Sequence, residues 1–544
     1  MTEVKSRLDT WLIAVLLLSI VVGIFFRGYH LEQKTFWEDE IIGTVRALGY
    51  TEAEIVRSAP QIVSAADLQK FFRPSPTRFG NVSTTLASLA SEDPQHTPLF
   101  YVLNRLWVER IGATVTTLRT LPAFYGCLAI VAMYWVGIEL YRRHSTALIA
   151  SALLGISPIA VLYSQEAREY SMWTLAVLVG SAVFLRACRL DTREWWFAYA
   201  VAAVVGFYVF PLTALVIAGH GLYLAVAAER RSSQITRSYL FACLFAGLLC
   251  LPWLASMNAD NGIRGIHTIL STVSSPKTIV LTFWRDIKLS LVDFGYTQSR
   301  WLALASSFYG IVFTIIVSYA IYVNARAGVR ERVGFLLWGF VGPFIPVVVH
   351  DLIYHGVLVF QARYFVPVYL SVGFALASFF GATLDKQTNG VPKRVFWGAA
   401  FLLLVSSGVF SCAMSAKAWT WYNKDYERTP QVAALINHMR QPLLIADRGT
   451  SRVLGLGFYL NPSVAMSVNL HCDNCSVRPS LRHNLLADRN GYSDIVMIGR
   501  GPDEGSSDEG FETAIREPAR HIIIIRTRIF PRSETPLNMF AATY

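Results

Sequence analysis

The segment WLIAVLLLSIVVGIFF, Trp11 to Phe26, runs for sixteen residues without a charged side chain. A helix of about 20 largely apolar residues is long enough to cross the hydrocarbon core of a bilayer. Lys5 and Arg7 precede this run as they would in a secretory signal, but no small-residue cleavage site follows it. We therefore expect a retained first span and a membrane protein.

The whole chain has a composition that excludes an ordinary soluble enzyme. Its 544 residues are 53% hydrophobic and 16% charged, with a mean hydropathy of +0.41. The formal net charge is +11, yet from Ala416 onward 15 Lys and Arg oppose 13 Asp and Glu, which leaves only +2 there. The excess lies in short loops of the membrane region, which indicates topology. The expected environment is a lipid bilayer, and no nucleic-acid partner is expected.

Apolar runs predict a polytopic α-helical membrane protein of about eleven spans. They are 11–26, 119–141, 145–163, 169–188, 195–210, 211–228, 238–256, 301–324, 333–353, 364–383 and 395–415. Basic residues gather in alternate loops, which by the positive-inside rule face the cytoplasm. The amino terminus is then cytoplasmic and residues after about 416 are extracytoplasmic, as expected in a bacterial inner membrane.

The chain divides into a membrane domain, 1–415, and a small outer α/β domain, 416–544. Outer loops are expected at 27–118 and 257–300, with an interfacial helix at Pro98–Val108. Short β-branched runs predict the strands of the outer domain; they are Pro442–Ala446, Ser493–Ile498 and His521–Ile525. Gly455 and Gly457 lack the full phosphate-cradling pattern and are interpreted as turn glycines.

Two of the seven cysteines, Cys472 and Cys475, fall in the outer domain, where the compartment is oxidising. A small disulfide is expected between them. A zinc site with His471 and His483 is the alternative, although the second ligand pair is badly spaced. The other five lie in or beside predicted spans and are expected to be packing residues; they are Cys127, Cys188, Cys243, Cys250 and Cys412.

Unusual polar residues gather at the outer ends of the predicted spans. Arg119, Arg168 and Arg363 each stand where a helix enters the bilayer, a costly place for an unpaired charge. Snorkelling explains one such arginine, but three on one leaflet, each near carboxylates, favour binding of an anion. A carboxylate can take a proton from a hydroxyl while arginines or a metal stabilise a leaving phosphate.

Five motifs occur in a fixed order along residues 1–415. They are an acid pair after the first span, H-x-P-L-x-Y at 96–101, L-R-x-L-P-A at 118–123, S-P-x-x-x-x-Y-S-Q-E-A-R-x-Y-S at 157–171 and R-Y-x-x-P at 363–367. This ordered set resembles the GT-C superfamily of membrane glycosyltransferases, in the branch of protein O-mannosyltransferases (glycosyltransferase family 39) and lipid A aminoarabinose transferases. The resemblance implies a GT-C fold and glycosyl transfer from a polyprenyl phosphate sugar.

The same resemblance assigns catalytic roles to three acids. Asp39 matches the catalytic base, Glu40 beside it is support or a metal ligand, and Glu166 matches a second acid of the site. A divalent metal ion is implied as a possible cofactor, with Asp39 and Glu166 as candidate ligands. Because Glu38 makes three acids in a row, Glu40 or Glu38 could be the base instead. If 36–46 is helical, Asp39 and Glu40 lie about 100° apart, and only one can point straight into a cleft.

Donor binding is expected of Arg119, Arg168, Arg363, His96 and Tyr364. The resemblance places Arg119 and Arg363 in the lipid-phosphate region and adds Arg168. His96 stands where the family has His-Pro-Pro, whereas this chain reads His-Thr-Pro, which loosens the backbone there.

Other polar residues are interpreted differently. Trp37 is expected to be an interfacial anchor. Basic residues of the loop 257–300 either touch the donor phosphate or are solvated; they are Arg264, His267, Arg285 and Lys288, with Asp286 beside them.

The leading hypothesis is an inverting transferase that moves a sugar from polyprenyl phosphate to a hydroxyl of an unknown glycan, lipid or protein acceptor. A transporter of lipid-linked sugars is the alternative, but no internal repeat is visible and the acids gather at one face. An en bloc oligosaccharide transferase of the same fold, or an inactive glycan-binding relative, also fits the motifs. The sugar and the acceptor are left open.

Overall fold

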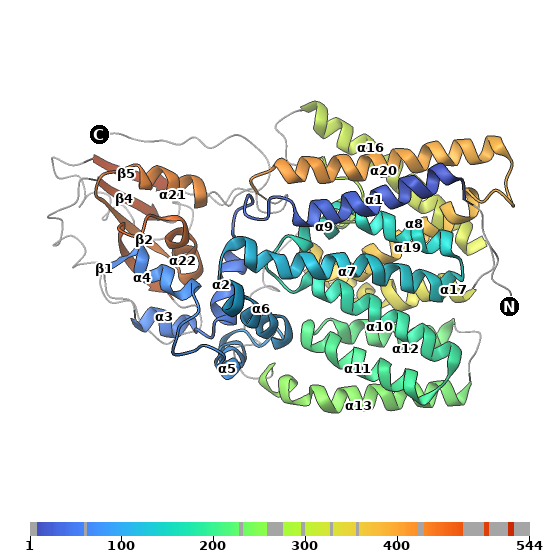
Figure 1. Cartoon of the computed structure of the whole chain (residues 1–544), viewed down its shortest axis with the longest axis horizontal. Coiled ribbons are helices and arrows are strands. Elements are labelled where there is room, and N and C mark those ends of the chain that lie inside the picture. Colours follow the sequence, from blue (N-terminus) through green and yellow to red (C-terminus); the bar gives the residue numbers. More distant parts are fainter. Residues whose placement is uncertain are drawn as a thin grey trace. The chain divides into compact units, whose positions relative to one another are not determined.

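The computed structural model describes residues 8–58, 62–227, 232–257, 276–294, 300–326, 330–354, 358–420, 429–471, 494–499 and 521–526. The chain forms two compact units. The first, called the helical unit, contains Met1–Gln33, Leu89–Asn104 and Val115–Tyr422. The second, called the mixed unit, contains Lys34–Ser88, Arg105–Thr114 and Asn423–Tyr544. Figure 1 shows the helices of the first and the sheet of the second.

Long apolar helices build the helical unit (Figure 1). Eight helical segments in the described residues are long and apolar enough to cross a membrane, and a ninth is the bent pair α8 and α9. The eight are α1 (Thr10–Gly28), α7 (Val115–Tyr141), α10 (Tyr170–Leu190), α13 (Ser233–Met257), α16 (Arg300–Arg326), the segment Glu331–Tyr354, the segment Ala362–Thr383 and α20 (Val391–Lys417). The predicted polytopic helical class is confirmed.

Two composite spans contain several helix types. Glu331–Tyr354 begins within α17 (Arg330–Gly334) and continues as the π-helix η2 (Phe335–Val341), η3 (Gly342–Phe344) and α18 (Ile345–Tyr354). Ala362–Thr383 comprises η5 (Ala362–Phe365) and α19 (Val366–Thr383), which follow η4 (Leu358–Phe360).

All eleven predicted spans coincide with helical structure in the described residues. The fifth and sixth are the shorter helices α11 (Arg193–Val209) and α12 (Thr213–Val226). They are separated at Phe210 and Pro211, where the extended backbone of Phe210 ends α11. Three further helices are α5 (Val82–Glu92), α6 (Pro98–Ile111) and α15 (Pro276–Lys288).

The predicted span 145–163 is broken. It consists of α8 (His144–Gly155) and α9 (Pro158–Ser164), whose axes differ by 63°. Pro158 has no backbone N–H to continue the ladder of α8, and the residue before a proline is disfavoured in the helical region. Ser157 is accordingly extended, with φ −70° and ψ 115°. The chain therefore turns before it reaches the polar segment that follows α9.

The α8 end of this bend packs closely on α1. A Cβ atom at Gly23 would collide with the backbone of Gly155, so the two helices approach as small residues allow. The buried guanidinium of Arg27 donates to the carbonyl oxygens of Gly155 at 2.7 Å and Leu154 at 3.0 Å. These carbonyls belong to the last turn of α8, where they have no partner within the helix. Arg27 thus caps α8.

A five-stranded sheet organises the mixed unit, with strand order β1-β3-β2-β4-β5. The strands are β1 (Ile62–Ser64), β2 (Pro442–Gly449), β3 (Ala465–His471), β4 (Asp494–Gly499) and β5 (His521–Arg526). All neighbours are parallel except β1, which runs antiparallel to β3. The predicted strands appear as β2, β4 and β5, while β3 was missed. The pairing of β1 with β3 brings residues of the predicted first outer loop into this sheet.

Short helices accompany the sheet. They are α2 (Glu38–Ala47), α3 (Glu52–Ser58), α4 (Ala65–Gln69), η1 (Lys70–Phe72), α21 (Thr429–Asn437) and α22 (Thr450–Tyr459). The interpretation of Gly455 and Gly457 as turn glycines is wrong, because both are buried within α22. A Cβ atom at Gly455 would lie 2.9 Å from Cδ1 of Ile41 on α2, so this glycine permits close helix packing.

Some sequence-based expectations fall outside the described residues. These are the Cys472–Cys475 disulfide, the zinc alternative that needs His483, and the roles of Arg264 and His267. The five described cysteines are free thiols, and Cys250 and Cys412 are buried. Pro98–Val108 is helical, as part of α6.

Candidate active site

The three consecutive acids Glu38, Asp39 and Glu40 form the first turn of α2 in the mixed unit. Glu40 is fully buried, and its Oε2 accepts the backbone N–H of Trp37 at 3.3 Å. Glu38 accepts the hydroxyl of Ser451 and lies 3.7 Å from Nε of Arg452. Asp39 is half-buried and takes part in neither contact. The three acids therefore have different environments, although each is favoured near a helix N-terminus.

Helix α22 holds the beginning of α2. The backbone N–H of Phe36 donates to the hydroxyl of Tyr459 at 2.6 Å, and the rings of Phe36 and Phe458 lie 5.2 Å apart. Farther along, Ile41 packs at Gly455. Contacts before, at and after the acidic turn thus fix α2 against one helix, so the carboxylates belong to an ordered element.

In the helical unit, the segment between α9 and α10 carries a second polar group centred on Glu169. This carboxylate is completely buried at the start of α10. Its Oε1 lies 2.9 Å from Nδ1 of His96, and its Oε2 lies 3.3 Å from Nε of Arg168 and accepts the hydroxyl of Tyr101 at 3.2 Å. One carboxylate therefore orients a histidine, an arginine and a tyrosine that come from two separate parts of the chain.

The Glu169 carboxyl is ionised at neutral pH. Burial raises its pKa, but the charge of Arg168 and the charge and hydrogen bond of His96 outweigh burial and lower the pKa to about 2. A carboxylate this acidic is a poor proton acceptor for catalysis near pH 7. The geometry therefore makes Glu169 a positioning residue for His96 and Arg168.

Aromatic rings surround the arginines of this group. The guanidinium of Arg168 lies 5.7 Å from the ring centroid of Tyr170, and that of Arg363 lies 5.5 Å from the same ring. Arg363 also lies 5.7 Å from the ring of Tyr364. We call the seven residues His96, Tyr101, Arg168, Glu169, Tyr170, Arg363 and Tyr364 the cation–aromatic cluster. It unites four of the five predicted donor-binding residues.

The other two predicted residues of the helical unit are also buried. Arg119 is fully buried near the start of α7, and its guanidinium donates to the carbonyl oxygen of Leu31 at 2.6 Å. Glu166 is 1% exposed in the segment before α10. Their predicted roles stay predictions.

Three members of the cluster were missed in the sequence. Glu169 and Tyr170 stand inside the motif at 157–171, and Tyr101 closes the motif at 96–101. Their positions in those motifs were the available signal. Glu166 in the same segment is buried as well, so Glu169 is recognised by its contacts with His96, Arg168 and Tyr101 and not by burial.

A further buried acid lies on α15. Asp286 is 1% exposed, and its Oδ1 lies 2.8 Å from a terminal nitrogen of Arg285. Burial raises the pKa of Asp286 to about 6, against the lowering effect of Arg285. Both interpretations of the basic residues in this loop, contact with the donor phosphate and solvation, stay open.

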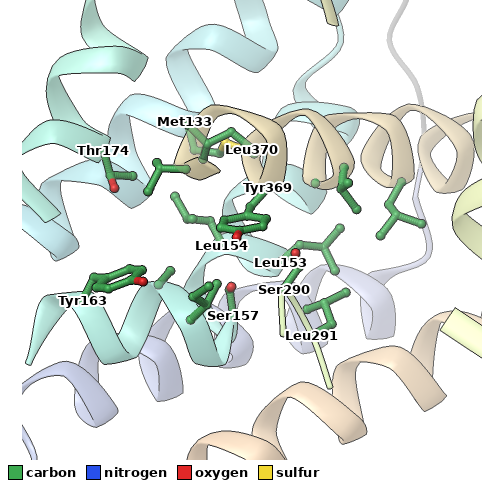
Figure 2. A pocket seen from close by; sticks show the side chains of 16 residues that line it. Met133, Leu153, Leu154, Ser157, Tyr163, Thr174, Ser290, Leu291, Tyr369 and Leu370 are labelled. Atoms are coloured by element: carbon green, nitrogen blue, oxygen red, sulfur yellow. The ribbon is translucent and has the colours of Figure 1, made fainter. Parts of the chain in front are cut away.

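The helical unit contains a cavity of about 40 Å³. Figure 2 shows the side chains that line it. Tyr369 reaches into it from α19, with Ser157 and Ser290 nearby and apolar side chains around them. The hydroxyls of Tyr369 and Ser290 are buried and have no hydrogen-bond partner among the described residues. A cavity of roughly 150 Å³ is needed to admit benzene, whereas a much smaller one can hold water. The cavity therefore suits ordered water and is too small for a prenyl chain.

The implied metal ion finds no complete donor set within the described residues. No group of three His, Cys, Asp or Glu side chains there is placed to hold a metal ion. We derive no reaction step through a metal.

Comparison with known proteins gives a partial match. No protein-family profile matches the chain. An undecaprenyl phosphate-alpha-4-amino-4-deoxy-L-arabinose arabinosyl transferase of Pectobacterium atrosepticum is 26% identical over 163 residues, 29% of each protein. The chain resembles GT-C membrane glycosyltransferases. A second such transferase, from Pectobacterium carotovorum, is 23% identical over 163 residues. The match spans 29% of the length of these curated relatives.

This GT-C-like chain can also be superposed on a solved structure. It is the crystal structure of ArnT from Cupriavidus metallidurans bound to undecaprenyl phosphate, with a TM-score of 0.47 and 12% identity. The superposition covers 84% of this chain and 85% of ArnT. The resemblance predicted from the ordered motifs is confirmed by the sequence matches.

Proposed function

We propose that the protein is an inverting glycosyltransferase that moves a sugar from polyprenyl phosphate to a hydroxyl acceptor at the outer face of a bacterial inner membrane. The observation that carries this proposal is the cation–aromatic cluster, in which a buried carboxylate orients Arg168 and His96. Oriented cations stabilise charge that develops on a leaving phosphate. The aminoarabinose transferases matched by sequence are named for an undecaprenyl phosphate sugar, which supports a donor of this class.

The proposed reaction is a single displacement. The acceptor hydroxyl loses its proton to the carboxylate of Asp39, and its oxygen forms a bond to the anomeric carbon of the sugar. The bond between that carbon and the phosphate oxygen breaks, and polyprenyl phosphate leaves with the electron pair. Arg168, Arg363, Arg119 and His96 bind the phosphate. Configuration inverts because one bond forms as another breaks on opposite faces.

The choice of Asp39 as base rests on its match to the catalytic base of the family that the ordered motifs resemble. Glu40 is buried and accepts the N–H of Trp37, and Glu38 contacts Ser451 and Arg452. Both carboxylates therefore have structural partners that hold the start of α2. Asp39 is half-buried, so a substrate hydroxyl can reach its carboxylate.

The test is turnover of purified full-length protein with a panel of polyprenyl phosphate pentoses and hexoses and candidate hydroxyl acceptors. Mass spectrometry would measure released polyprenyl phosphate. Loss of a general base slows such reactions by about 10²–10⁴-fold, so we expect this loss for Asp39→Asn. Glu38→Gln is the matched control and should retain most of the activity.

Two results would contradict the proposal. If Asp39→Asn kept full activity and Glu38→Gln lost activity, Glu38 would be the base in place of Asp39. Donor binding and sugar movement across vesicles without a covalent product would replace the transferase by a transporter.

A further inference from the structure

The mixed unit contains a pocket of about 660 Å³ that the proposed chemistry does not use. Tyr50, which follows the end of α2, and η1 contribute to its lining. Ligand sites commonly measure about 300–1,000 Å³, so this pocket is large enough for a sugar. A helix of ten residues is about 15 Å long, which separates Tyr50 from the acidic turn at the other end of α2.

The lining of this pocket carries an excess of positive charge. Lys70, Arg73, Arg78 and Glu54 line it. Arg78 forms an ion pair with Glu54 and donates to the carbonyl oxygen of Gly49, so these two charges are internally satisfied. Lys70 and Arg73 are exposed. Neither forms an ion pair with another residue that the structure describes, and an anion in the pocket would meet both.

Aromatic stacking does not explain the pocket. Tyr50 and Phe71 line it, but they are only 8% and 5% exposed, and the guanidinium of Arg78 lies 4.3 Å from the centroid of the Tyr50 ring. A neutral sugar that binds by stacking on a ring would find little open face. Recognition must come from charge and hydrogen bonds.

The uncharged lining suits a polyhydroxylated ligand. The hydroxyl of Ser58 donates to the carbonyl oxygen of Ile55, and those of Ser75 and Thr77 bond to each other at 2.9 Å. Each hydroxyl oxygen can still accept a hydrogen bond from a ligand hydroxyl. Pro74 and Pro76 stand in the same rim and restrict its backbone, which lowers the entropy lost on binding. A bare phosphate would use the two cations but leave these hydroxyls and most of the volume without a role.

We propose that this pocket binds an anionic saccharide. On the proposed transferase function, on which this step rests, the saccharide is a part of the acceptor distant from the reacting hydroxyl. The length of α2 separates the pocket from Asp39, so the acceptor extends over more than one sugar unit. The pocket then selects acceptors by charge and leaves the chemistry to other residues.

Binding can be measured without donor or turnover. Purified full-length protein is titrated calorimetrically with tetragalacturonate, an anionic oligosaccharide, and with neutral maltotetraose of the same length. Loss of charge-assisted hydrogen bonds costs about tenfold or more in affinity. We expect tetragalacturonate to bind at least that much more tightly than maltotetraose. Inorganic phosphate at the same concentration should not displace it.

Variants locate the site within the mixed unit. The double variant Lys70→Ala/Arg73→Ala should weaken tetragalacturonate binding about tenfold or more. Ser75→Trp should weaken it by filling the pocket without changing charge. Arg57→Ala removes an exposed charge of the same unit outside the pocket and should leave affinity unchanged. Circular dichroism would confirm that each variant is folded.

The outcomes separate this proposal from the transferase. Any one of four results would overturn the proposed saccharide site. They are equal affinity for the two oligosaccharides, absence of binding, displacement by phosphate, and unchanged binding in the double variant. Asp39→Asn should bind tetragalacturonate like the wild type. If polyprenyl phosphate release fails while pocket-dependent binding is measured, the transferase is wrong and the saccharide site stands.

Discussion

Glu169 shows how one buried carboxylate organises residues that are far apart in the chain. His96 and Arg168 both contact it, and its pKa of about 2 keeps it ionised wherever the protein is folded near neutral pH. Removing the charge would leave the buried guanidinium of Arg168 without its carboxylate. Removing one partner of a buried ion pair destabilises the folded protein, because the other charge stays buried without compensation.

We therefore predict that Glu169→Gln destabilises the protein by roughly 3 kcal/mol and raises the KM for the donor more than it lowers kcat. Thermal unfolding and donor titration would measure both effects. Glu194→Gln, an exposed acid at the start of α11, is the control; it should leave the KM unchanged and lower stability by no more than about 1 kcal/mol, the usual contribution of an acid at a helix N-terminus. An unchanged KM in a destabilised Glu169→Gln protein would show that Glu169 is only structural.

The pKa of Asp286 is raised, whereas that of Glu169 is lowered, so the stability that Asp286 contributes decreases as pH rises. Burial raises its folded-state pKa from an ordinary 3.8 to about 6, so the folded protein holds this proton more tightly than the unfolded chain. Its contribution to stability is present below about pH 3.8 and is lost as pH rises to about 6. The difference in Tm between wild type and Asp286→Asn should fall across this window and then level off. A difference that rises with pH would contradict the raised pKa.

At the scale of elements, the contact between α2 and α22 decides where the acidic turn is held. The side chains of Phe36, Glu38 and Ile41 contact α22, and Gly455 lets the helices come close. A larger residue there would push on Ile41, the residue that directly follows Glu40.

Gly455→Leu should destabilise the mixed unit by about 1–3 kcal/mol through overpacking, with a matching loss of Asp39-dependent turnover. Adding Ile41→Ala in the same chain should restore part of the stability and part of the turnover, since it removes the atoms that collide. Gly180→Ala on α10 is the control, because a Cβ atom there has nothing within 4 Å. Denaturant unfolding and polyprenyl phosphate release would be measured for all variants. Failure of the double variant to recover would contradict the packing explanation.

Elements also show where sequence patterns succeed and fail. Apolar length predicted helical structure at each of the eleven segments, since that property belongs to the segment itself, but the 63° break at Pro158 divided one of them. Eight described segments, and a ninth if the bent pair is counted, are long and apolar enough to span a membrane. Strands β2, β4 and β5 were predicted from β-branched runs. The glycines of α22 were misassigned because a glycine that permits close helix packing has the same local sequence as a turn glycine.

For the whole molecule, the proposed orientation can be tested directly. Cysteine is introduced at Arg57 in the mixed unit or at Arg193 at the start of α11, after the seven native cysteines are replaced. Because the positive-inside rule places Arg193 in the cytoplasm, a membrane-impermeant maleimide applied to intact bacteria should label Arg57→Cys only. Permeabilised cells should label at both sites. Labelling of Arg193→Cys alone in intact cells would show that the orientation is the reverse of the proposed one. It would also contradict a reaction at the outer face.

The sequence by itself determined the membrane class, the positions of the spans, the α/β character of the last part and the ordered motifs, because apolar length, alternation and residue order are local properties. Tertiary structure decided that Ile62 pairs with Ser467, that α22 holds α2, and that Glu169 gathers His96 and Arg168. These contacts join residues far apart in the chain. Such pairings depend on how the packed elements meet, and no single segment encodes them.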